Sequence, residues 1–475
     1  MNKISTGLDG LDEILYGGFI PKRSYLLRGG PGSGKSSIGY HFLKHALNRD
    51  KQVLYITLGE PKEQILENAQ HIGMDLSGIH FVDLTPSDDI KKHSTNYNVF
   101  SASEIEQPPI FEAITGAIEK YKPERVVLDS VTMLRFLNQD AYNFRHTGLS
   151  FIKYIVRRGA TLLLISESSE HINDQDSVFW VDGILDVEYS TAWRKLYVSK
   201  FRGSDFMHGN HAFKIDDKGV TIFPRLHPNR YENVFKNQVL SSGIDQIDHL
   251  LHGGIEKGTT TLITGASGVG KTNLGIQFIN EAATRNERSA IYTFEESKEL
   301  ILRRSKMINI PIDEMIQKGN LKIVPVEPLS YSPDEFSAMV KKDIEDHDTQ
   351  MVMIDTIGAY SMAVRDENTL ERLHSLTVYL QNMGITTFLI NESSNITGDL
   401  SATTMHASYL ADNIIFLRYL EIQGKIRKAI GVLKKRLSSF ENVIREYEIT
   451  TDGIKVGKPL KNLRGILTGM PELIK

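Results

Sequence analysis

Two glycine-rich segments carry the residue types that hold phosphate groups in proteins. Residues 29–36 read GGPGSGKS and residues 265–272 read GASGVGKT, so both match the P-loop pattern. In that pattern the glycines let backbone N–H groups converge on the phosphates, and the lysine reaches the β- and γ-phosphates. An apolar run precedes each segment and a helical pattern follows it. Glycine-rich structural turns are the alternative, but two matches at equivalent places in a duplicated chain argue against them.

The two segments predict which side chains bind ATP and Mg²⁺. The expected nucleotide contacts within them are Gly30, Gly32, Ser33, Gly34, Lys35, Ser36 and Ser37 in the first, and Ser267, Gly268, Val269, Gly270, Lys271, Thr272 and Asn273 in the second. Lys35 and Lys271 are also the expected catalytic cations. The hydroxyl groups of Ser36 and Thr272 are the expected Mg²⁺ ligands.

Two aspartates end later apolar runs. Asp129 and Asp355 occupy equivalent places, and a hydroxyl residue, Ser130 or Thr356, follows each of them. A carboxylate at the end of such a strand can hold the water shell of Mg²⁺ in P-loop enzymes. A helix N-cap aspartate is the alternative. Because the P-loops are present, we interpret both aspartates as parts of the metal sites.

Glutamates stand at a third pair of equivalent places. Glu60 and Glu296 each lie 25 residues after the P-loop lysine of their copy. A carboxylate beside the γ-phosphate can orient and deprotonate the attacking water or hydroxyl, so these are candidate general bases. The second copy also has Glu295, a further candidate base and Mg²⁺ ligand, where the first has Gly59. A solvated loop acid or a helix N-cap is the alternative.

Longer segments recur with the same spacing, which makes the chain a tandem duplication. Residues 4–12 (ISTGLDGLD) reappear as residues 240–248 (LSSGIDQID), and a Gly-Gly pair follows in each copy. The join in residues 227–239 is polar and lacks periodicity. We therefore predict two domains, residues 1–230 and 231–475, each large enough to bury its own core.

The elements that must position these side chains follow from the apolar patterns. Short β-branched runs separated by amphipathic helices predict a parallel α/β sheet in each copy. One predicted helix carries Ile110, Ile114 and Ile118 on a single face. Another is expected to open at the pair Ser332 and Pro333, which suit an N-cap and a first-turn position.

The last third of each copy is antiparallel in character. Residues 413–422, a Gln-Gly turn and residues 425–436 predict a hairpin. Upstream, residues 55–60 (YITLGE) are paired with residues 292–296 (YTFEE), which aligns their tyrosines. The predicted fold class is thus α/β, with mainly parallel central sheets and C-terminal antiparallel hairpins.

Composition excludes several classes of protein. The chain has 475 residues, of which 40% are hydrophobic and 24% charged, and it has no cysteine, so disulfides and thiolate chemistry are excluded. No apolar run approaches the roughly 18 residues of a membrane span. The net charge of −4 gives no global attraction to nucleic acid or anionic lipid. With no basic, apolar leader, we expect a cytoplasmic protein.

In combination, these motifs resemble the KaiC family, the RecA-like ATPases of the circadian clock. The resemblance also rests on residues 200–203 (KFRG) and 293–297 (TFEES), and it spans nearly the whole chain. It implies two tandem RecA-like P-loop NTPase domains, a homohexamer of two stacked rings, and ATP at the subunit interfaces. It further implies that the first domain is a slow ATPase that binds KaiB, and that the second is an autokinase and autophosphatase.

The resemblance also assigns ATP contacts made from a neighbouring subunit. The matching positions are Lys200, Phe201, Arg202, Ser204 and Asp217 in the first copy, and Lys434, Lys435, Arg436 and Ser438 in the second. Charge supplied to the γ-phosphate across an interface is the arginine-finger device. An exposed basic strand end is the alternative. Leu437, in place of a glycine, and Ile308, in place of an aromatic residue, depart from the family pattern.

A phosphorylation site is implied in the same way. The Ser-Thr pair that the family phosphorylates precedes an Asp-x-Ile-Ile strand, which is residues 412–415 here. The pair therefore falls on Ser408 and Tyr409, with Thr403 as a further candidate upstream. The resemblance makes Glu295 the general base. Judged without it, these hydroxyl groups would be turn residues.

The expected partners follow from the resemblance as well. The chain ends at Lys475, shortly after a Gly-Met-Pro segment, so the tail that KaiA engages is not expected, whereas a KaiB-type partner is. One alternative is a DNA-dependent ATPase of the RecA/RadA type, which would need basic DNA-binding loops that the sequence does not show. Another is a nucleotide-gated scaffold without kinase activity.

Overall fold

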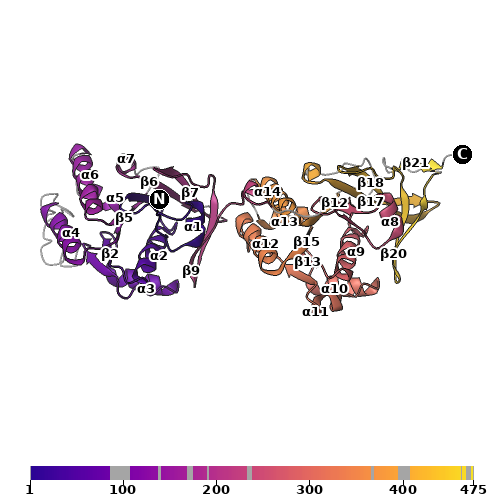
Figure 1. Cartoon of the computed structure of the whole chain (residues 1–475), viewed down its shortest axis with the longest axis horizontal. Coiled ribbons are helices and arrows are strands. Elements are labelled where there is room, and N and C mark those ends of the chain that lie inside the picture. Colours follow the sequence, from indigo (N-terminus) through magenta and orange to yellow (C-terminus); the bar gives the residue numbers. More distant parts are fainter. Residues whose placement is uncertain are drawn as a thin grey trace, which may run out of the picture. The chain divides into compact units, whose positions relative to one another are not determined.

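The computed structural model describes residues 2–85, 107–136, 141–167, 175–189, 192–232, 238–364, 368–393, 407–461, 463–466 and 472–473. The chain divides into two compact units, Met1–Arg225 and Leu226–Lys475 (Figure 1). Within the described ranges, no helix has the length and apolar character needed to cross a membrane.

The first unit begins with a short helix and alternates strands and helices before ending in four consecutive strands. Its helices are α1 (Asp9–Ile14), α2 (Lys35–Leu47), α3 (Lys62–His71), α4 (Gln107–Tyr121), α5 (Val131–Phe136), α6 (Ala141–Arg157) and α7 (Gln175–Trp180). Its strands are β1 (Ser24–Gly29), β2 (Val53–Thr57), β3 (His80–Asp83), β4 (Arg125–Asp129), β5 (Thr161–Glu167), β6 (Gly183–Tyr189), β7 (Arg194–Phe201), β8 (His211–Asp216) and β9 (Gly219–Phe223).

The second unit repeats this order of elements. Its helices are η2 (Pro228–Arg230), α8 (Asp245–Leu250), α9 (Lys271–Thr284), α10 (Lys298–Met307), α11 (Ile312–Gln317), α12 (Pro333–His347), α13 (Ile357–Val364), α14 (Thr369–Asn382) and η3 (Ala407–Leu410). Its strands are β10 (Val239–Leu240), β11 (Ile255–Glu256), β12 (Thr260–Gly265), β13 (Arg288–Thr293), β14 (Leu321–Pro325), β15 (Thr349–Asp355), β16 (Thr386–Glu392), β17 (Asn413–Ile422), β18 (Lys425–Lys435), β19 (Arg445–Thr450), β20 (Gly453–Pro459), β21 (Leu463–Arg464) and β22 (Glu472–Leu473).

Each unit is built around one nine-stranded sheet, and the two sheets have the same strand order. The first runs β3-β2-β4-β5-β1-β6-β7-β8-β9 and the second β14-β13-β15-β16-β12-β17-β18-β19-β20. Strands up to β6, or β17, pair in parallel, and the remaining strands pair antiparallel. The parallel strands therefore end together at one edge, where the phosphate loops follow β1 and β12. The predicted fold class is confirmed.

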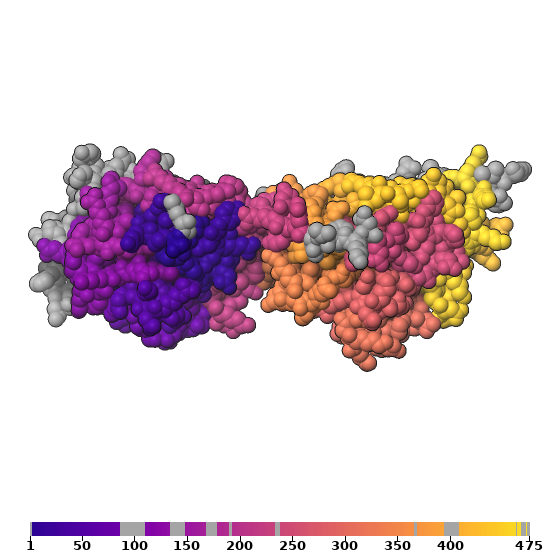
Figure 2. Space-filling view, in the orientation of Figure 1, coloured from indigo at the N-terminus to yellow at the C-terminus, as the bar shows by residue number. Residues whose placement is uncertain are grey.

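Helices cover both faces of each sheet, because the parallel strands are apolar on both sides. In the first unit Phe42 of α2 belongs to the core on one face, and Ile114 of α4 belongs to the core on the other. In the second unit Phe278 of α9 and Phe336 of α12 have the corresponding places. The labels of Figure 1 show these helices flanking the strands. In Figure 2 the last strands, in yellow, form the surface at the right-hand end of the second unit.

Several local predictions are confirmed in detail. The Ser332 hydroxyl accepts the Glu335 N–H at 3.1 Å as the N-cap of α12, and Pro333 is the first helical residue. The predicted hairpin is β17 and β18. Its turn residues Gln423 and Gly424 have φ values of 52° and 71°, which suits a two-residue hairpin loop.

Candidate functional site

The first phosphate loop connects β1 to α2 at the carboxyl edge of the sheet. Lys35 is only 7% exposed, and its Nζ donates to the carbonyl oxygens of Gly29 at 2.9 Å and Gly30 at 2.7 Å. Gly34 has a φ of +100°, and a Cβ there would come within 2.6 Å of Ile215. Any side chain would therefore strain the backbone and clash with β8, which explains the glycine before the lysine.

The second phosphate loop has the same construction and opens into a cavity. Lys271 is 7% exposed, and its Nζ donates to the Ala266 carbonyl oxygen at 2.9 Å. The cavity has a volume of about 280 Å³. Its lining is Ser267, Gly268, Gly270, Lys271, Thr272, Asn273, Thr293, Glu295, Glu296, Arg304, Asp355, Thr356, Glu392 and Ile449. The structure thus brings all the predicted acids of this copy to the phosphate loop.

The strand-end aspartates meet the loop hydroxyls in both units. Ser36 Oγ donates to Asp129 Oδ2 at 2.7 Å, and Thr272 Oγ1 donates to Asp355 Oδ2 at 2.8 Å. The helix after Asp355 is capped by Thr356, whose hydroxyl accepts the Ala359 N–H at 3.1 Å. In the second unit, the geometry therefore assigns the capping to Thr356 and leaves the aspartate directed at the loop.

Burial and neighbouring charges shift the pKa values of the ionisable side chains around each loop. Burial lowers the pKa of Lys35, opposed by the charges of Glu167 and Asp129. Burial also raises the pKa of Asp355 to about 6. The hydrogen bond from Thr272 opposes that rise, the charge of Glu296 adds to it, and the charge of Arg304 opposes it.

Burial likewise lowers the pKa of Lys271, opposed by the charges of Glu392, Asp355 and Glu295. Glu392 ends β16 as Glu167 ends β5. Both glutamates were visible in the sequence as strand ends, but no site role was predicted for them.

A threonine fixes the glutamate-bearing turns in both units. Thr57 Oγ1 donates to the Glu60 carbonyl oxygen at 2.5 Å, and Thr293 Oγ1 donates to that of Glu296 at 2.9 Å. Glu60 and Glu296 are therefore structural equivalents, and Gly59 corresponds to Glu295.

The same register corrects the pairing of two tyrosines. Counting back from the threonines, Tyr55 corresponds to Ile291 and not to Tyr292. Side chains alternate faces along a strand, so the offset of one residue separates the two tyrosines. Tyr55 OH donates to Asp129 Oδ2 at 2.6 Å, whereas Tyr292 packs edge-on against Phe336. The first site thus contains the phenol of Tyr55, whereas the phenol of Tyr292, which the sequence comparison paired with it, lies on the other face of its sheet.

Each equivalent glutamate has a partner on the following helix, eight residues later. Asn68 Nδ2 donates to Glu60 Oε1 at 2.5 Å, and Arg304 Nη1 donates to Glu296 Oε1 at 2.6 Å. Burial and the charge of Asp129 raise the pKa of Glu60, and the hydrogen bond from Asn68 opposes this. Neither Asn68 nor Arg304 was predicted from the sequence.

Glu295 stands apart from this pair. Its side chain is exposed, and its Oε1 accepts the Thr356 hydroxyl at 3.1 Å. The cap residue of α10 is Ser297, whose hydroxyl accepts the Leu300 N–H at 3.4 Å. Neither Glu295 nor Glu296 therefore caps that helix, and both remain in the cavity wall.

The basic strand ends lie at the opposite edge of their own sheet. Gly183 pairs with both Tyr25 and Phe201, whereas the phosphate loop begins four residues beyond Tyr25, at Gly29. That separation is about 13 Å along the strand. Lys200, which adjoins Phe201, therefore points away from its own loop, and its Nζ donates to the Val178 carbonyl oxygen in α7 at 2.9 Å.

The second unit repeats this placement. Leu262 pairs with Ile414, which pairs with Lys434, while the loop begins at Gly265, about 10 Å further along the strand. Lys434 Nζ donates to the carbonyl oxygens of Ser408 at 3.1 Å and of Ala411 at 2.6 Å.

Arg436 is held at the same edge of the second sheet. Its Nη1 lies 3.3 Å from Asp412 Oδ1. The equivalent Arg202 is exposed, and its carbonyl oxygen accepts Nη1 of Arg23 at 2.6 Å. Each of the two arginines thus sits beside a basic strand end and not beside its own phosphate loop.

The remaining predicted contacts from the neighbouring subunit have varied surroundings. Phe201 is buried and stacks on Tyr25 at 5.6 Å, and Lys435 is buried in an ion pair with Glu256 at 3.1 Å. Ser204 accepts Lys3 Nζ at 2.7 Å.

The other two lie on the surface. Asp217 is exposed in the turn between β8 and β9, and Ser438 is exposed beyond β18. The buried side chains of Phe201 and Lys435 therefore contribute to their own unit, whereas those of Asp217 and Ser438 are accessible at its surface.

The predicted phosphorylation sites lie on and before η3. Ser408 is half-buried, and Tyr409 is 45% exposed with its ring edge-on to His374 at 5.4 Å. Burial raises the pKa of Tyr409, and the charge of Glu371 adds to this. Thr403 lies outside the described residues.

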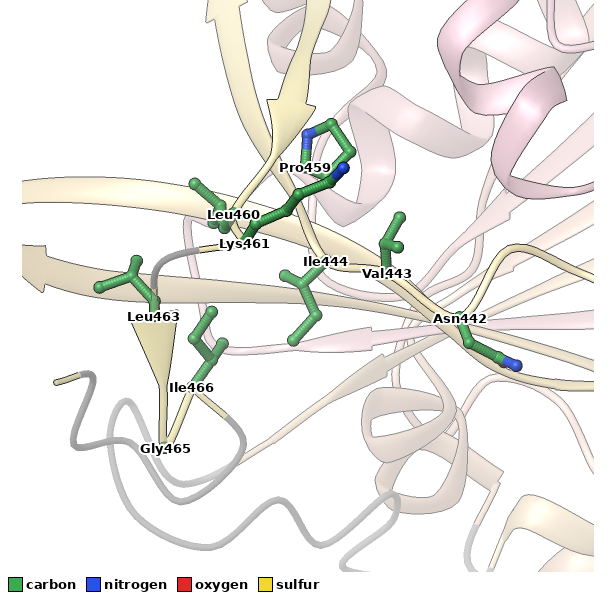
Figure 3. A pocket seen from close by; sticks show the side chains of 9 residues that line it. All are labelled: Asn442, Val443, Ile444, Pro459, Leu460, Lys461, Leu463, Gly465 and Ile466. Atoms are coloured by element: carbon green, nitrogen blue, oxygen red, sulfur yellow. The ribbon is translucent and has the colours of Figure 1, made fainter. Parts of the chain in front are cut away.

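A second cavity of the second unit carries no such chemistry. It has a volume of about 450 Å³, and its wall comes from the strands near the end of the chain (Figure 3). Figure 3 shows mostly aliphatic side chains around it, among them Ile444, Leu460 and Ile466. Among the described residues that line it there is no carboxylate, and we place the functional site at the phosphate loops.

The donor chemistry of the loops fits Mg·ATP. Mg²⁺ prefers oxygen ligands and keeps several waters, so a hydroxyl and a carboxylate in contact are a suitable partial set. Among the described residues there is no cluster of three or more His, Asp or Glu side chains that could hold a metal alone.

The family is shown by a match that covers both units. The model of the KaiC ATPase family matches residues 4–227 and again residues 240–461. The chain belongs to the KaiC family. Both units are therefore KaiC-type ATPase domains, with the sheet order and loop position described above.

Curated KaiC proteins match over nearly their whole length. The circadian clock oscillator protein KaiC of Acaryochloris marina is 30% identical over 489 residues, covering 99% of this chain and 91% of that protein. KaiC of Rippkaea orientalis is 30% identical over 492 residues, covering 100% and 92%. KaiC of Synechococcus elongatus is 29% identical over 490 residues, covering 99% and 92%.

Proposed function

We propose that this KaiC-family chain binds Mg·ATP at both phosphate loops, hydrolyses it slowly, and transfers its γ-phosphoryl group to Ser408. The second domain would also remove that phosphate. The chain would work as a cytoplasmic homo-oligomer, a hexamer of two stacked rings, in clock- or stress-type signalling. A KaiB-type protein is the proposed partner of the first domain.

The observation that carries this proposal is the position of Ser408. It precedes β17, at the edge of the sheet opposite the loop that starts at Gly265. A phosphoryl group at Lys271 therefore cannot reach the Ser408 of its own chain without a large rearrangement. A neighbouring subunit, stacked edge to edge, would bring the two together and would bring Lys434 and Arg436 to the same phosphate.

The chemistry assigned to each residue is simple. In the second site the Ser408 oxygen of the neighbour attacks the γ-phosphorus, the bond to the ADP oxygen breaks, and the proton passes to Glu295. In the first site water attacks in place of serine, and Glu60 takes its proton. Lys35 and Lys271 hold the phosphates, and the charge of a neighbour's basic residues stabilises the transferring group. Mg²⁺, held by Ser36 with Asp129 or by Thr272 with Asp355, would neutralise phosphate charge.

The transfer between subunits can be tested by mixing variants. Lys271→Ala subunits cannot hold the donor phosphate, and Ser408→Ala subunits lack the acceptor. Mixing them with Mg·ATP should restore phosphate on Ser408 of the former, detected by phosphoprotein mass spectrometry. Tyr409→Phe is the matched control and should incorporate phosphate like the unaltered chain. Equal incorporation by Ser408→Ala and the unaltered chain would refute the assignment.

The shared nucleotide can be tested through assembly. If residues of two subunits hold each ATP, Lys35→Ala and Arg202→Ala should lower the hexamer fraction in sizing experiments with ATP. Arg49→Ala, an exposed arginine of the same unit, is the control. Hexamers that form equally well without ATP and with either substitution would contradict the interface.

A further inference from the structure

The second phosphate site differs from the first by a compensated pair of charges. Among the described residues, the charges of Asp129 and Glu167 act on Lys35, and the charge of Asp129 acts on Glu60. The second cavity has four carboxylates, and it has Arg304 in addition to its loop lysine. The extra acid stands at the equivalent of Gly59 and the extra cation at the equivalent of Asn68. The charges of the added acid and the added cation therefore cancel.

The added cation makes one of the two neighbouring glutamates unavailable to an attacking group. Arg304 Nη1 occupies Oε1 of Glu296 at 2.6 Å. The other oxygen, Oε2, is shielded from solvent and has no hydrogen-bond partner among the described residues. Oε2 of Glu296 therefore cannot meet a water in the cavity, and a proton taken by Oε1 would neutralise the carboxylate that holds the guanidinium group.

Glu295 has the opposite character. It is exposed to the cavity, and its contact there is the neutral hydroxyl of Thr356. In the first site, the partner of Glu60 is the neutral amide of Asn68, which can leave without separating opposite charges. The carboxylate that is free to act is thus Glu60 in the first site. In the second site it is Glu295, which corresponds to Gly59 and not to Glu60.

We infer that Arg304 is a positioning residue that selects Glu295 as the base of the second site by holding Glu296 in an ion pair. This inference rests on the proposed ATP turnover at that site, and does not depend on phosphorylation of Ser408. The reaction it governs is attack of a water oxygen on the γ-phosphorus. The bond from phosphorus to the ADP oxygen breaks, and the water proton passes to the selected carboxylate.

The test is whether Glu296 can replace Glu295 as the base when the positive charge of Arg304 is removed. In the full chain with Glu60→Gln, remaining ADP release comes from the second site. Adding Glu295→Gln should slow this turnover at least about 100-fold, the lower range for a positioned general base. Adding Arg304→Asn as well should restore it at least tenfold, because Glu296 is then free. The recovery should vanish when Glu296→Gln is added.

Two controls separate this effect from loss of structure. Arg303→Asn removes an exposed arginine from the same helix and should give no recovery with Glu295→Gln. Arg304→Lys keeps the positive charge and should also give none. Binding of a fluorescent ATP analogue checks that each variant keeps its site, and Arg304→Gln replaces Arg304→Asn if the latter fails that check.

The outcomes distinguish this inference from the proposed function. A Glu295→Gln, Arg304→Asn chain that binds the analogue but stays as slow as Glu295→Gln alone overturns the inference, as does unchanged turnover with Glu295→Gln. The expected pattern without any phosphate on Ser408 would refute the autokinase and leave the inference standing. A Glu60→Gln chain that neither releases ADP nor labels Ser408 would contradict both.

Discussion

The two phosphate sites of this chain share a scaffold and differ in how they hold their acids. In both, a loop lysine is buried, and a loop hydroxyl donates to a strand-end aspartate. A threonine also fixes the turn that bears Glu60 or its equivalent, Glu296. The first site then has Gly59 and Asn68, and the second has Glu295 and Arg304. The phosphate loops, which depend on backbone geometry, have the same construction in both units, while the acids beside them differ through side chains that the backbone does not constrain.

Steric facts show that the divergence is not forced by the fold. A Cβ at Gly59 would meet nothing closer than 3.8 Å, and the residue does not have a positive φ. A side chain could therefore stand there as it does at Glu295. The difference between the sites is a chemical one and can be exchanged by substitution.

The largest expected effect is the loss of the first site's base. Glu60→Gln in a Lys271→Ala chain, where ADP release reports the first site, should slow turnover by about 100- to 10,000-fold. Glu63→Gln, a change of the same kind on the following helix, is the control. Unchanged turnover would move the base to another residue.

A smaller loss is expected when the first site receives the cation of the second. Asn68→Arg in the same Lys271→Ala chain should pair with Glu60 and slow ADP release by about 10- to 100-fold, a part of what a general base supplies. Adding Gly59→Glu should restore turnover, since the new carboxylate at position 59, the equivalent of Glu295, can then act as the base. If the double variant stays as slow as Asn68→Arg alone, these two residues do not account for the difference between the sites.

The acidic limb of the pH–rate profile should report the ionisation of Glu60 in the first site. Glu60 must be ionised to accept a proton, and burial with the charge of Asp129 raises its pKa, so first-site turnover should fall on the acidic side at a higher pH than for an ordinary glutamate. The Asn68 hydrogen bond opposes that rise. Asn68→Ala should therefore move the acidic limb to higher pH, and Asn68→Arg to lower pH. Movement in the reverse direction would exclude Glu60 as the titrating group.

The smallest effects concern the two tyrosines. Tyr55→Phe removes a hydrogen bond to Asp129 and should lower the free energy of unfolding by about 0.5–1.5 kcal/mol, measured by urea titration. It should also tighten Mg²⁺ binding at the first site, because the phenol no longer occupies Oδ2. The hydroxyl of Tyr292 is buried without a partner among the described residues, so Tyr292→Phe should leave stability unchanged or raise it. Equal losses from both would contradict the assignment.

The sequence predicts those parts of the fold that depend on near neighbours. The Ser332 cap, the Gln423 turn and the apolar runs that become parallel strands are each specified within a few residues. The loop residues Lys35 and Ser36 belong to the same class, because the P-loop pattern is contiguous.

The contacts that distinguish the sites are not local in this sense. Asn68 and Arg304 reach their glutamates from the far end of a helix, where only the packed structure decides which side chain arrives. The tyrosines show a second limit. A one-residue slip in aligning two strands reverses the face of every side chain, so Tyr55 and Tyr292 looked equivalent although they point to opposite sides of their sheets.

The hydrogen bond from Lys200 to the carbonyl of Val178 has an optical consequence. Both tryptophans of the chain, Trp180 and Trp193, belong to the first unit, and Trp180 ends α7, the helix that accepts this lysine. Tryptophan fluorescence therefore reports on the first unit and not on the second. If Lys200 leaves α7 for a neighbour's nucleotide, the surroundings of Trp180 change with it. The wavelength of maximum tryptophan emission of the unlabelled protein then reports nucleotide occupancy in the first unit.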